Sequence, residues 1–376
     1  MSRSALSDYL DSLPARGIPF CDCVVYRGHK PVFRRSAGFL DAEKTKPAGS
    51  GAAFWLYSAT KPITCTAVMQ LVEKGRLSLD APVSDYLPEY GSLQVRHGNR
   101  TEPAEIPLTI RHLLSMQSGL NYDINVPSIR KKLEETNRKA TTREIIGALA
   151  SEPLDFEPGT HFQYSLSHDV LGAVVEAVSG QSFGEYLGEH IFTPLGMEHT
   201  GFTQTPWQKA HFSDQFEYRP ETMTASPVSR ANGYVLSPNY ESGGAGLAST
   251  VDDYIRFLDA LCNHGVSAEG YRLLSMESIE QMRENQLGEA SLKDFALLNK
   301  KGYGYGLGVR TLMEKEHSGV KSPLGEFGWD GAAGVYVLAD TENRLAIFYA
   351  QQVLNCGYAF DVIHPTIRDL VYSELL

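Results

Sequence analysis

A serine and a lysine stand three residues apart, as Ser58 and Lys61, where an apolar segment that continues to Val72 begins. On a helix, side chains at positions i and i+3 lie on one face, so the lysine amine can reach the serine hydroxyl. A serine becomes a good nucleophile when a neighbour takes its proton, and a lysine can do so if burial lowers its pKa. The pair therefore predicts an activated serine. With Ser58 as the N-cap of the helix, Pro62 would be tolerated in its first turn.

The same spacing recurs in two places where the surrounding residues do not favour chemistry. Ser128 and Lys131 open a charged run, which is typical of a solvated helix face. Ser318 and Lys321 lie in a polar stretch that offers no burial to lower a lysine pKa. Only Ser58 precedes an apolar helix, so it is the preferred nucleophile.

Longer stretches of sequence resemble one known superfamily. The motifs are Phe54-x-x-x-Ser58-x-Thr60-Lys61 and the segments 71–83, 110–120, 159–165, 194–197 and 243–250. Together they resemble the serine β-lactamase and penicillin-binding-protein superfamily, and most closely the branch of class C β-lactamases, DD-peptidases and family VIII carboxylesterases. The similarity runs from about residue 15 to about residue 355. It implies an acyl-enzyme on Ser58.

The resemblance also assigns the other catalytic groups. Tyr164 stands where the second motif of the family has a tyrosine, which implies that Tyr164 and Lys61 share a proton as general base and then general acid. The N–H groups of Ser58 and Ala332 would form the oxyanion hole. No cofactor is implied.

The substrate-binding residues expected from the same resemblance belong mostly to the third motif. The family has Lys-Thr-Gly or His-x-Gly there, and the best candidate in this chain is Trp329-Asp330-Gly331. Gly331 would let the backbone approach the substrate. Leu166, in the second motif, and Tyr57, beside the nucleophile, are further expected lining residues.

Two departures from the family pattern favour an esterase. The second motif reads Tyr164-Ser165-Leu166 and lacks the asparagine of β-lactamases and DD-peptidases, and the third motif lacks their lysine. A site built to pair with a carboxylate loses heavily without its partner, and Asp330 would repel that carboxylate. We therefore expect a carboxylesterase or acyltransferase acting on a small ester or amide. A β-lactamase or D-amino-acid peptidase and a non-catalytic acyl-binding protein remain alternatives.

Strand patterns near both ends of the chain, with helix patterns between them, predict one sheet built from distant segments. The expected fold is α/β, with an antiparallel sheet flanked by helices and an inserted, mostly helical lobe, as the resemblance also implies. The predicted α/β domain comprises residues 1–79 and 240–376, and the helical domain residues 80–239. Residues 302–310 are expected to form a strand, and residues 334–339 and 344–351 a hairpin.

A second serine, Ser182, lies in a Gly-x-Ser-x-Gly sequence that resembles the nucleophile elbow of other hydrolases. That elbow requires a preceding strand, whereas residues 170–178 have a helical pattern. We therefore interpret Gly180 as a helix C-terminal cap and Ser182 with Glu185 as the capping box of the next helix.

Composition limits the partners of the protein. A net charge of −11 argues against nucleic acid or an anionic membrane as partner. No signal peptide or membrane-length apolar run is visible, which favours a cytoplasmic location. Cys21 and Cys23 are expected to be buried in a strand, and no metal site is expected. The sequence does not indicate an oligomeric state.

Overall fold

Strands from both ends of the chain meet in one seven-stranded sheet, and every neighbouring pair in it is antiparallel. The computed structural model describes residues 4–49, 51–316 and 319–376. In spatial order the strands are β2 (Lys30–Gly38), β1 (Phe20–Arg27), β13 (Leu345–Ala350), β12 (Tyr336–Asp340), β11 (Phe327–Gly328), β10 (Arg310–Leu312) and β9 (Tyr303–Tyr305). The predicted antiparallel α/β fold is therefore confirmed.

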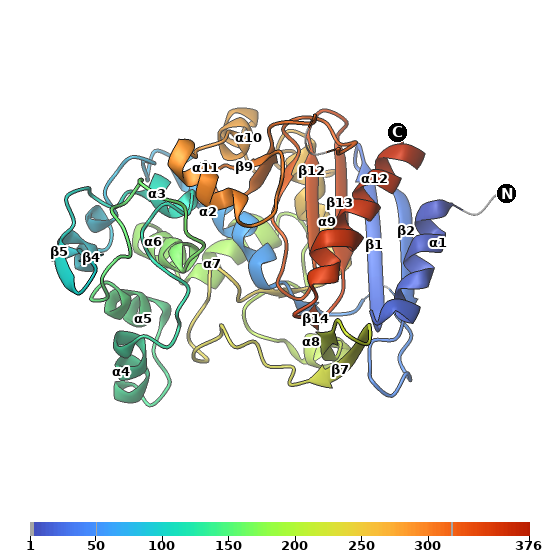
Figure 1. Ribbon diagram of the computed structural model, residues 1–376, viewed down its shortest axis with the longest axis horizontal. Helices are drawn as coiled ribbons and strands as arrows, with labels where there is room; N and C mark the ends of the chain where they lie inside the picture. Colours follow the sequence, from blue (N-terminus) through green and yellow to red (C-terminus); the bar gives the residue numbers. More distant parts are fainter. Residues whose placement is uncertain (1–3, 50, 317–318) are drawn as a thin grey trace.

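Helices cover both faces of this sheet (Figure 1). Because successive side chains of a strand point to opposite faces, Cys21 and Cys23 of β1 pack toward one core and Val24 toward the other. The first core includes residues of α1 (Ala5–Ser12) and α12 (His364–Glu374), and the second includes residues of α9 (Val251–Cys262). Both cysteines are buried in a strand, as predicted.

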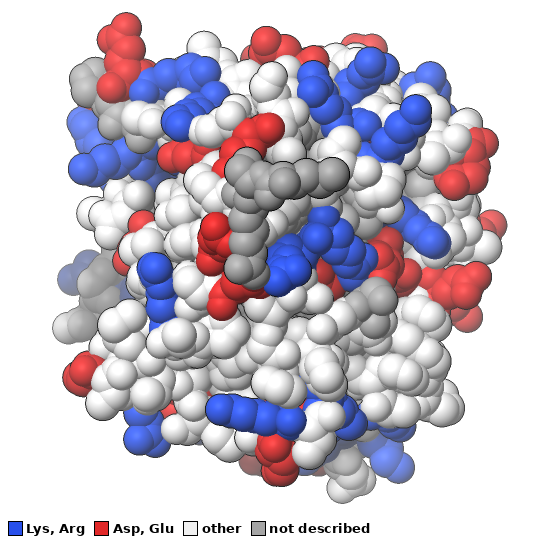
Figure 2. All heavy atoms as spheres, turned by 90° about the vertical axis from the view of Figure 1, so that its right-hand side faces the viewer, with Lys and Arg blue, Asp and Glu red and all other residues white. Residues whose placement is uncertain are grey.

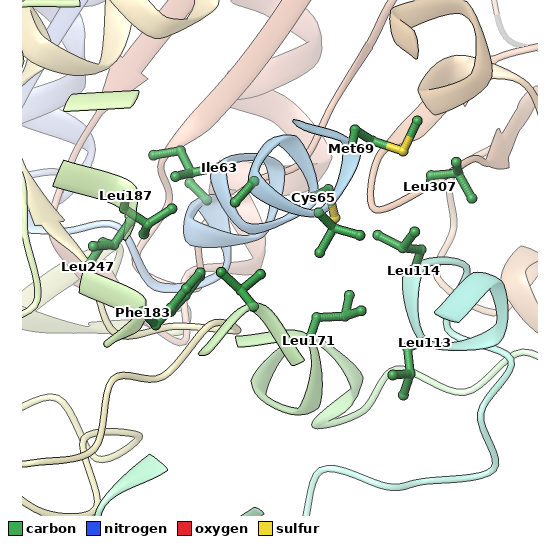
Figure 3. Packing of buried hydrophobic residues seen from close by; sticks show 14 of the residues in the cluster. Ile63, Cys65, Met69, Leu113, Leu114, Leu171, Phe183, Leu187, Leu247 and Leu307 are labelled. Atoms are coloured by element: carbon green, nitrogen blue, oxygen red, sulfur yellow. The ribbon is translucent and has the colours of Figure 1, made fainter. Parts of the chain in front are cut away.

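Helix α2 (Lys61–Glu73) runs through the main core. Every residue from Lys61 to Leu71 is buried, as expected for a helix surrounded by protein on all sides. Figure 3 shows Ile63, Cys65 and Met69 of this helix among apolar side chains from several other segments. The labelled neighbours are Leu113, Leu114, Leu171, Phe183, Leu187, Leu247 and Leu307.

The remaining helices lie mostly on the side of the molecule away from the chain termini (Figure 1). They are α3 (Ile110–Leu114), α4 (Pro127–Glu135), α5 (Thr142–Leu149), α6 (Ser167–Ser179), α7 (Phe183–Leu187), α8 (Pro206–His211), α10 (Met276–Arg283) and α11 (Glu289–Ala296). Three small sheets complete the fold: β14 (Val353–Leu354) with β6 (Gln215–Arg219) and β7 (Thr224–Val228), β3 (Phe54–Trp55) with β8 (Ala248–Ser249), and β4 (Gln94–His97) with β5 (Arg100–Pro103). The division into two lobes remains a prediction, and the pairing of β6 with β14 ties residues 215–228 to the C-terminal part of the chain.

One predicted strand is wrong in its extent. Residues 302–310 contain all of β9, a turn and the first residue of β10, instead of a single strand. Gly306 donates its N–H to the carbonyl of Val309, and Gly308 has a φ of 84°. A glycine adopts this left-handed conformation without strain, so the period-two glycine pattern that suggested one strand instead supplies the turn. The predicted hairpin of residues 334–351 is confirmed as β12 and β13.

Charged side chains of both signs are interspersed on the face that carries α1 and α12, shown in Figure 2, and its lower part is mostly uncharged. This view therefore contains no extended field of one sign. A search of the described residues finds no helix with the length and apolarity needed to cross a membrane.

Candidate active site

Ser58 lies in a 3-10 turn, Tyr57–Thr60, that directly precedes α2. It is therefore not the N-cap of α2, which is Thr60, and Pro62 falls in the first turn as predicted. The preceding residue, Tyr57, has a φ of 48°, which is uncommon for a residue with a bulky side chain. Such backbone strain is stored where the surrounding structure holds it in place, and it is frequent at functional sites.

The structure assigns Tyr57 a different place from the expected substrate contact. Its ring is buried and its hydroxyl donates a hydrogen bond to Oε1 of Gln215 at 2.6 Å. Pairing of β3 with β8 fixes the chain just before it. Tyr57 thus anchors the strained turn that presents Ser58, and its contact with substrate remains a prediction.

Lys61 reaches Ser58 as the spacing predicts. Its Nζ donates hydrogen bonds to Oγ of Ser58 at 3.3 Å, to the hydroxyl of Tyr122 at 3.1 Å and to the carbonyl oxygen of Gly244 at 2.8 Å. The side chain is fully buried, and this burial lowers the pKa of Lys61 to about 7. A buried carboxyl, Asp169, acts in the opposite direction on that pKa. Near neutral pH the amine can thus accept the serine proton.

Tyr164 lies beside Lys61. Its ring centroid is 4.6 Å from Nζ of Lys61, and its hydroxyl accepts a hydrogen bond from the indole N–H of Trp329 at 2.9 Å. Burial raises the pKa of Tyr164, whereas the hydroxyl of Ser58 and the indole of Trp329 act to lower it. The structure therefore brings Ser58, Lys61, Tyr164 and Trp329 into one cluster.

Two backbone N–H groups remain available for an oxyanion. Within the described residues, no hydrogen bond engages the N–H of Ser58 or of Ala332. Ala332 is exposed although its neighbours are buried. Gly331 is packed on the nucleophile segment, since a Cβ at this position would lie 2.3 Å from the carbonyl oxygen of Leu56. The close approach that requires a glycine is thus to Leu56, two residues before Ser58, and the oxyanion hole remains a prediction.

Two other expected substrate contacts are not supported. Leu166 is 3% exposed and belongs to the main hydrophobic core. The carboxylate of Asp330 receives hydrogen bonds from Arg310 at 2.9 Å and Lys300 at 3.2 Å. Burial acts to raise the pKa of Asp330, but Arg310 and Lys300 outweigh it and hold this pKa at about 2. Leu166 is thus a core residue and Asp330 is held by two cations beside Trp329, and a contact of either side chain with substrate remains a prediction.

Sequence reasoning missed three groups around Lys61. Tyr122 belongs to none of the motifs, yet its hydroxyl accepts a hydrogen bond from Lys61 and its ring stacks on Tyr164 with centroids 5.3 Å apart. Because every residue has a backbone carbonyl, the sequence does not indicate that the carbonyl of Gly244 contacts Lys61. Asp169, which accepts hydrogen bonds from Tyr240 and Ser242, could have been found as an acid in the apolar helix α6.

The other serines that share a motif have structural roles in the described residues. Ser182 is the N-cap of α7 and forms the predicted capping box with Glu185, and Gly180 ends α6 in a left-handed conformation. Ser128 lies in α4, and Lys131 there is ion-paired with Glu135 on an exposed surface. Ser318 lies outside the described residues. Among the residues with described positions, no group of three or more His, Cys, Asp or Glu side chains could hold a metal ion.

A family model described as Beta-lactamase matches residues 6–358. The chain belongs to the Beta-lactamase family. The resemblance inferred from the Ser58 motif is thereby confirmed, as is the prediction of a serine hydrolase. Family membership does not by itself test the roles of individual site residues, which remain proposals.

Several relatives within this family are similar over most of their length. The chain is 30% identical to Esterase EstB of Burkholderia gladioli, covering 93% of this chain and 90% of the relative. It is 29% identical to Lovastatin esterase of Penicillium rubens, covering 90% and 88%. Among solved structures, EstCE1, described as a hydrolase with promiscuous acyltransferase activity, superposes with a TM-score of 0.80 at 24% identity, covering 98% of this chain and 97% of that one. That structural likeness supports the fold.

Proposed function

We propose that the protein is a carboxylesterase that hydrolyses small esters through an acyl-enzyme on Ser58, and that it can pass the acyl group to an alcohol in place of water. The supporting observation is the position of Lys61, whose fully buried Nζ lies 3.3 Å from the Oγ of Ser58 and whose pKa burial lowers to about 7. The relatives named as esterases support the same reaction class.

In the proposed first step, Oγ of Ser58 attacks the ester carbonyl carbon while neutral Lys61 accepts the serine proton. Negative charge develops on the carbonyl oxygen, and the N–H groups of Ser58 and Ala332 stabilise it. When the C–O bond to the leaving alcohol breaks, the alcohol oxygen takes a proton from Lys61, with Tyr164 completing the transfer path. The products of this step are the acyl-enzyme and a free alcohol.

Deacylation uses the same groups in reverse roles. Water, or an acceptor alcohol, attacks the acyl carbon while Lys61 takes its proton. The C–O bond to Ser58 then breaks and the serine oxygen regains a proton from Lys61. Hydrolysis releases a carboxylic acid, and transfer releases a new ester, so the balance between the two depends on which acceptor reaches the acyl carbon.

Substrate preference rests on different grounds from those the sequence suggested. Asp330 does not present an unpaired acid to the substrate, because Arg310 and Lys300 engage it. The preference for simple esters instead rests on the relatives and on Trp329, an indole that occupies the third-motif position and bonds Tyr164. The cytoplasmic location and the two-lobed division remain predictions.

The test compares three substrates under one set of conditions. We expect rapid turnover of p-nitrophenyl acetate and butyrate, slow turnover of a chromogenic cephalosporin, and loss of all turnover in Ser58→Ala. Added methanol should yield methyl ester if acyl transfer occurs. Turnover of the cephalosporin that matches or exceeds that of the esters would instead establish a β-lactamase. Ester turnover that persists in Ser58→Ala would reject the nucleophile assignment.

A further inference from the structure

A cavity of about 240 Å³ has Asp330, the residue that follows Trp329, in its wall. Its walls come from the segment after α11, from β10 and β12, and from the start of α12. Its lining includes four cationic side chains, Lys300, Lys301, Arg310 and Arg368, and one acid, Asp330. This excess of positive charge is unusual in a chain whose net charge is −11.

Two of these cations, Lys300 and Arg368, have donors that no described hydrogen bond uses. Arg310 is committed to Asp330 and to the carbonyl of Val337. Arg368, in contrast, uses Nε for Asp369 and one terminal nitrogen for the hydroxyl of Tyr303. Lys300 has three ammonium protons and makes one described hydrogen bond from them, to Asp330.

Two acids just outside the lining partly offset this positive charge. Glu326 is buried and accepts a hydrogen bond from the hydroxyl of Tyr303. Burial raises the pKa of Glu326, which favours the uncharged form of its carboxyl group. Asp369 is paired with Arg368. The cavity therefore retains an excess of cations on its wall.

One buried polar atom on the wall of this cavity has no hydrogen-bond partner among the described residues. His364 lines the cavity and is 3% exposed, and its Nε2 is bonded to the carbonyl oxygen of Gly334 at 3.1 Å. Its Nδ1 is buried without a hydrogen-bond partner and lies 3.9 Å from Oδ2 of Asp330. Because Nε2 donates its proton to the Gly334 carbonyl, Nδ1 of the neutral imidazole is an acceptor. It calls for a donor such as a hydroxyl group, so the case for an anion rests on the cations of the wall.

The rest of the wall is apolar and aromatic. The ring of Tyr336 stacks on the ring of His364 with centroids 4.8 Å apart, and the ring of Phe360 packs edge-on against it at 5.2 Å. Val320 and Pro365 also line the cavity. The cavity is smaller than the clefts that hold drug-sized ligands. A charged end and an aromatic wall in a small space fit an organic anion better than an inorganic one.

We propose that this cavity binds a small organic carboxylate, whose charged group pairs with Lys300, Lys301 and Arg368 and whose apolar body rests on Tyr336 and Phe360. This site is separate from the acyl-enzyme centre, although Lys300 connects the two. Its Nζ bonds Asp330 and lies 5.5 Å from the ring centroid of Trp329. The proposal does not depend on the esterase reaction.

Binding is measured by calorimetry on the full chain carrying Ser58→Ala, so that no turnover contributes heat. The probes are benzoate, its uncharged analogue benzyl alcohol and inorganic phosphate, at constant ionic strength. Benzoate should bind with a stoichiometry of one, whereas benzyl alcohol should not saturate and phosphate should bind clearly more weakly.

Matched lysine variants locate the binding. Lys301→Gln changes an exposed residue of the cavity rim and should weaken benzoate binding roughly tenfold, as loss of a charged hydrogen bond does. Lys293→Gln removes the same charge from α11 at a position that is ion-paired with Glu289 outside the cavity, and should leave binding unchanged. Benzoate bound at the oxyanion hole would be insensitive to Lys301→Gln.

Three results would overturn the proposal. They are the absence of saturable benzoate binding, equal affinities in the Lys301→Gln and Lys293→Gln proteins, and phosphate binding as tight as that of benzoate. None of these results depends on whether the wild-type protein hydrolyses esters, so the two proposals fail independently.

Discussion

The indole N–H of Trp329 donates a hydrogen bond of 2.9 Å to the hydroxyl oxygen of Tyr164. Their ring centroids are 5.5 Å apart, so the contact joins the second and third motifs directly. This bond occupies one lone pair of the phenol oxygen and leaves the other side of the oxygen for Ser58. A tryptophan at the third motif thus positions Tyr164, for which we propose a role in proton transfer.

Trp329→Phe should lower kcat/KM for p-nitrophenyl butyrate by up to about tenfold, because it removes one buried donor worth roughly 0.5–1.5 kcal/mol. Trp207→Phe is the control, since Trp207 stacks between His199 and His211 away from this contact. Steady-state kinetics of both variants provide the comparison. Equal activities would mean that the indole N–H does not position Tyr164.

The lowered pKa of Lys61 predicts the pH dependence of the reaction. The neutral amine is the active form, so log kcat/KM for an uncharged ester should rise with a slope of one toward about pH 7 and level off above it. An arginine cannot act as the base in this range, and Lys61→Arg should therefore lose about 10²–10⁴-fold in rate. A wild-type profile that stays flat down to pH 5 would contradict this role for Lys61.

Tyr122→Phe should move the acid limb of that profile to lower pH. The Tyr122 hydroxyl accepts a hydrogen bond from Lys61, which favours the charged amine, so its loss favours the neutral form. Tyr234→Phe is a suitable control, because the Tyr234 ring packs edge-on against Tyr122 and no described hydrogen bond joins it to Lys61. The two pH profiles should differ, and coinciding profiles would mean that the Tyr122 hydroxyl does not affect the pKa of Lys61.

Gly331→Ala should destabilise the fold by about 1–3 kcal/mol and reduce activity, since the added Cβ would lie 2.3 Å from the carbonyl oxygen of Leu56. Gly233→Ala places the same methyl group where nothing lies within 4 Å. Thermal unfolding and ester turnover of the two variants test the difference. If Gly331→Ala unfolds at the wild-type temperature with full activity, the close approach to Leu56 does not hold the oxyanion segment.

The sequence predicted those parts of the molecule that depend on local spacing. Ser58 and Lys61 are three residues apart, and the capping box of Ser182 with Glu185 is equally local. The antiparallel sheet could be inferred because its strand patterns stand at both ends of the chain. Family motifs supplied Tyr164, which local spacing alone would not have distinguished from a packed aromatic.

The parts that sequence missed depend on which distant groups meet. The pairing of Asp330 with Arg310 and Lys300 joins three positions that share no motif, and it removed the expected repulsion of a substrate carboxylate. Tyr122 meets Lys61 across 61 residues of sequence. Gly308 looked like part of a strand because a repeated glycine pattern does not reveal a φ of 84°.

The central claim is that Ser58 carries the acyl group, and intact-mass analysis tests it most directly. Wild-type protein is mixed with p-nitrophenyl butyrate and quenched in acid within milliseconds to seconds, then digested to locate any adduct. We expect a single butyryl group on the peptide that contains Ser58, and none in Ser58→Ala. A butyryl group on another residue, or ester turnover by Ser58→Ala at the wild-type rate, would contradict the account.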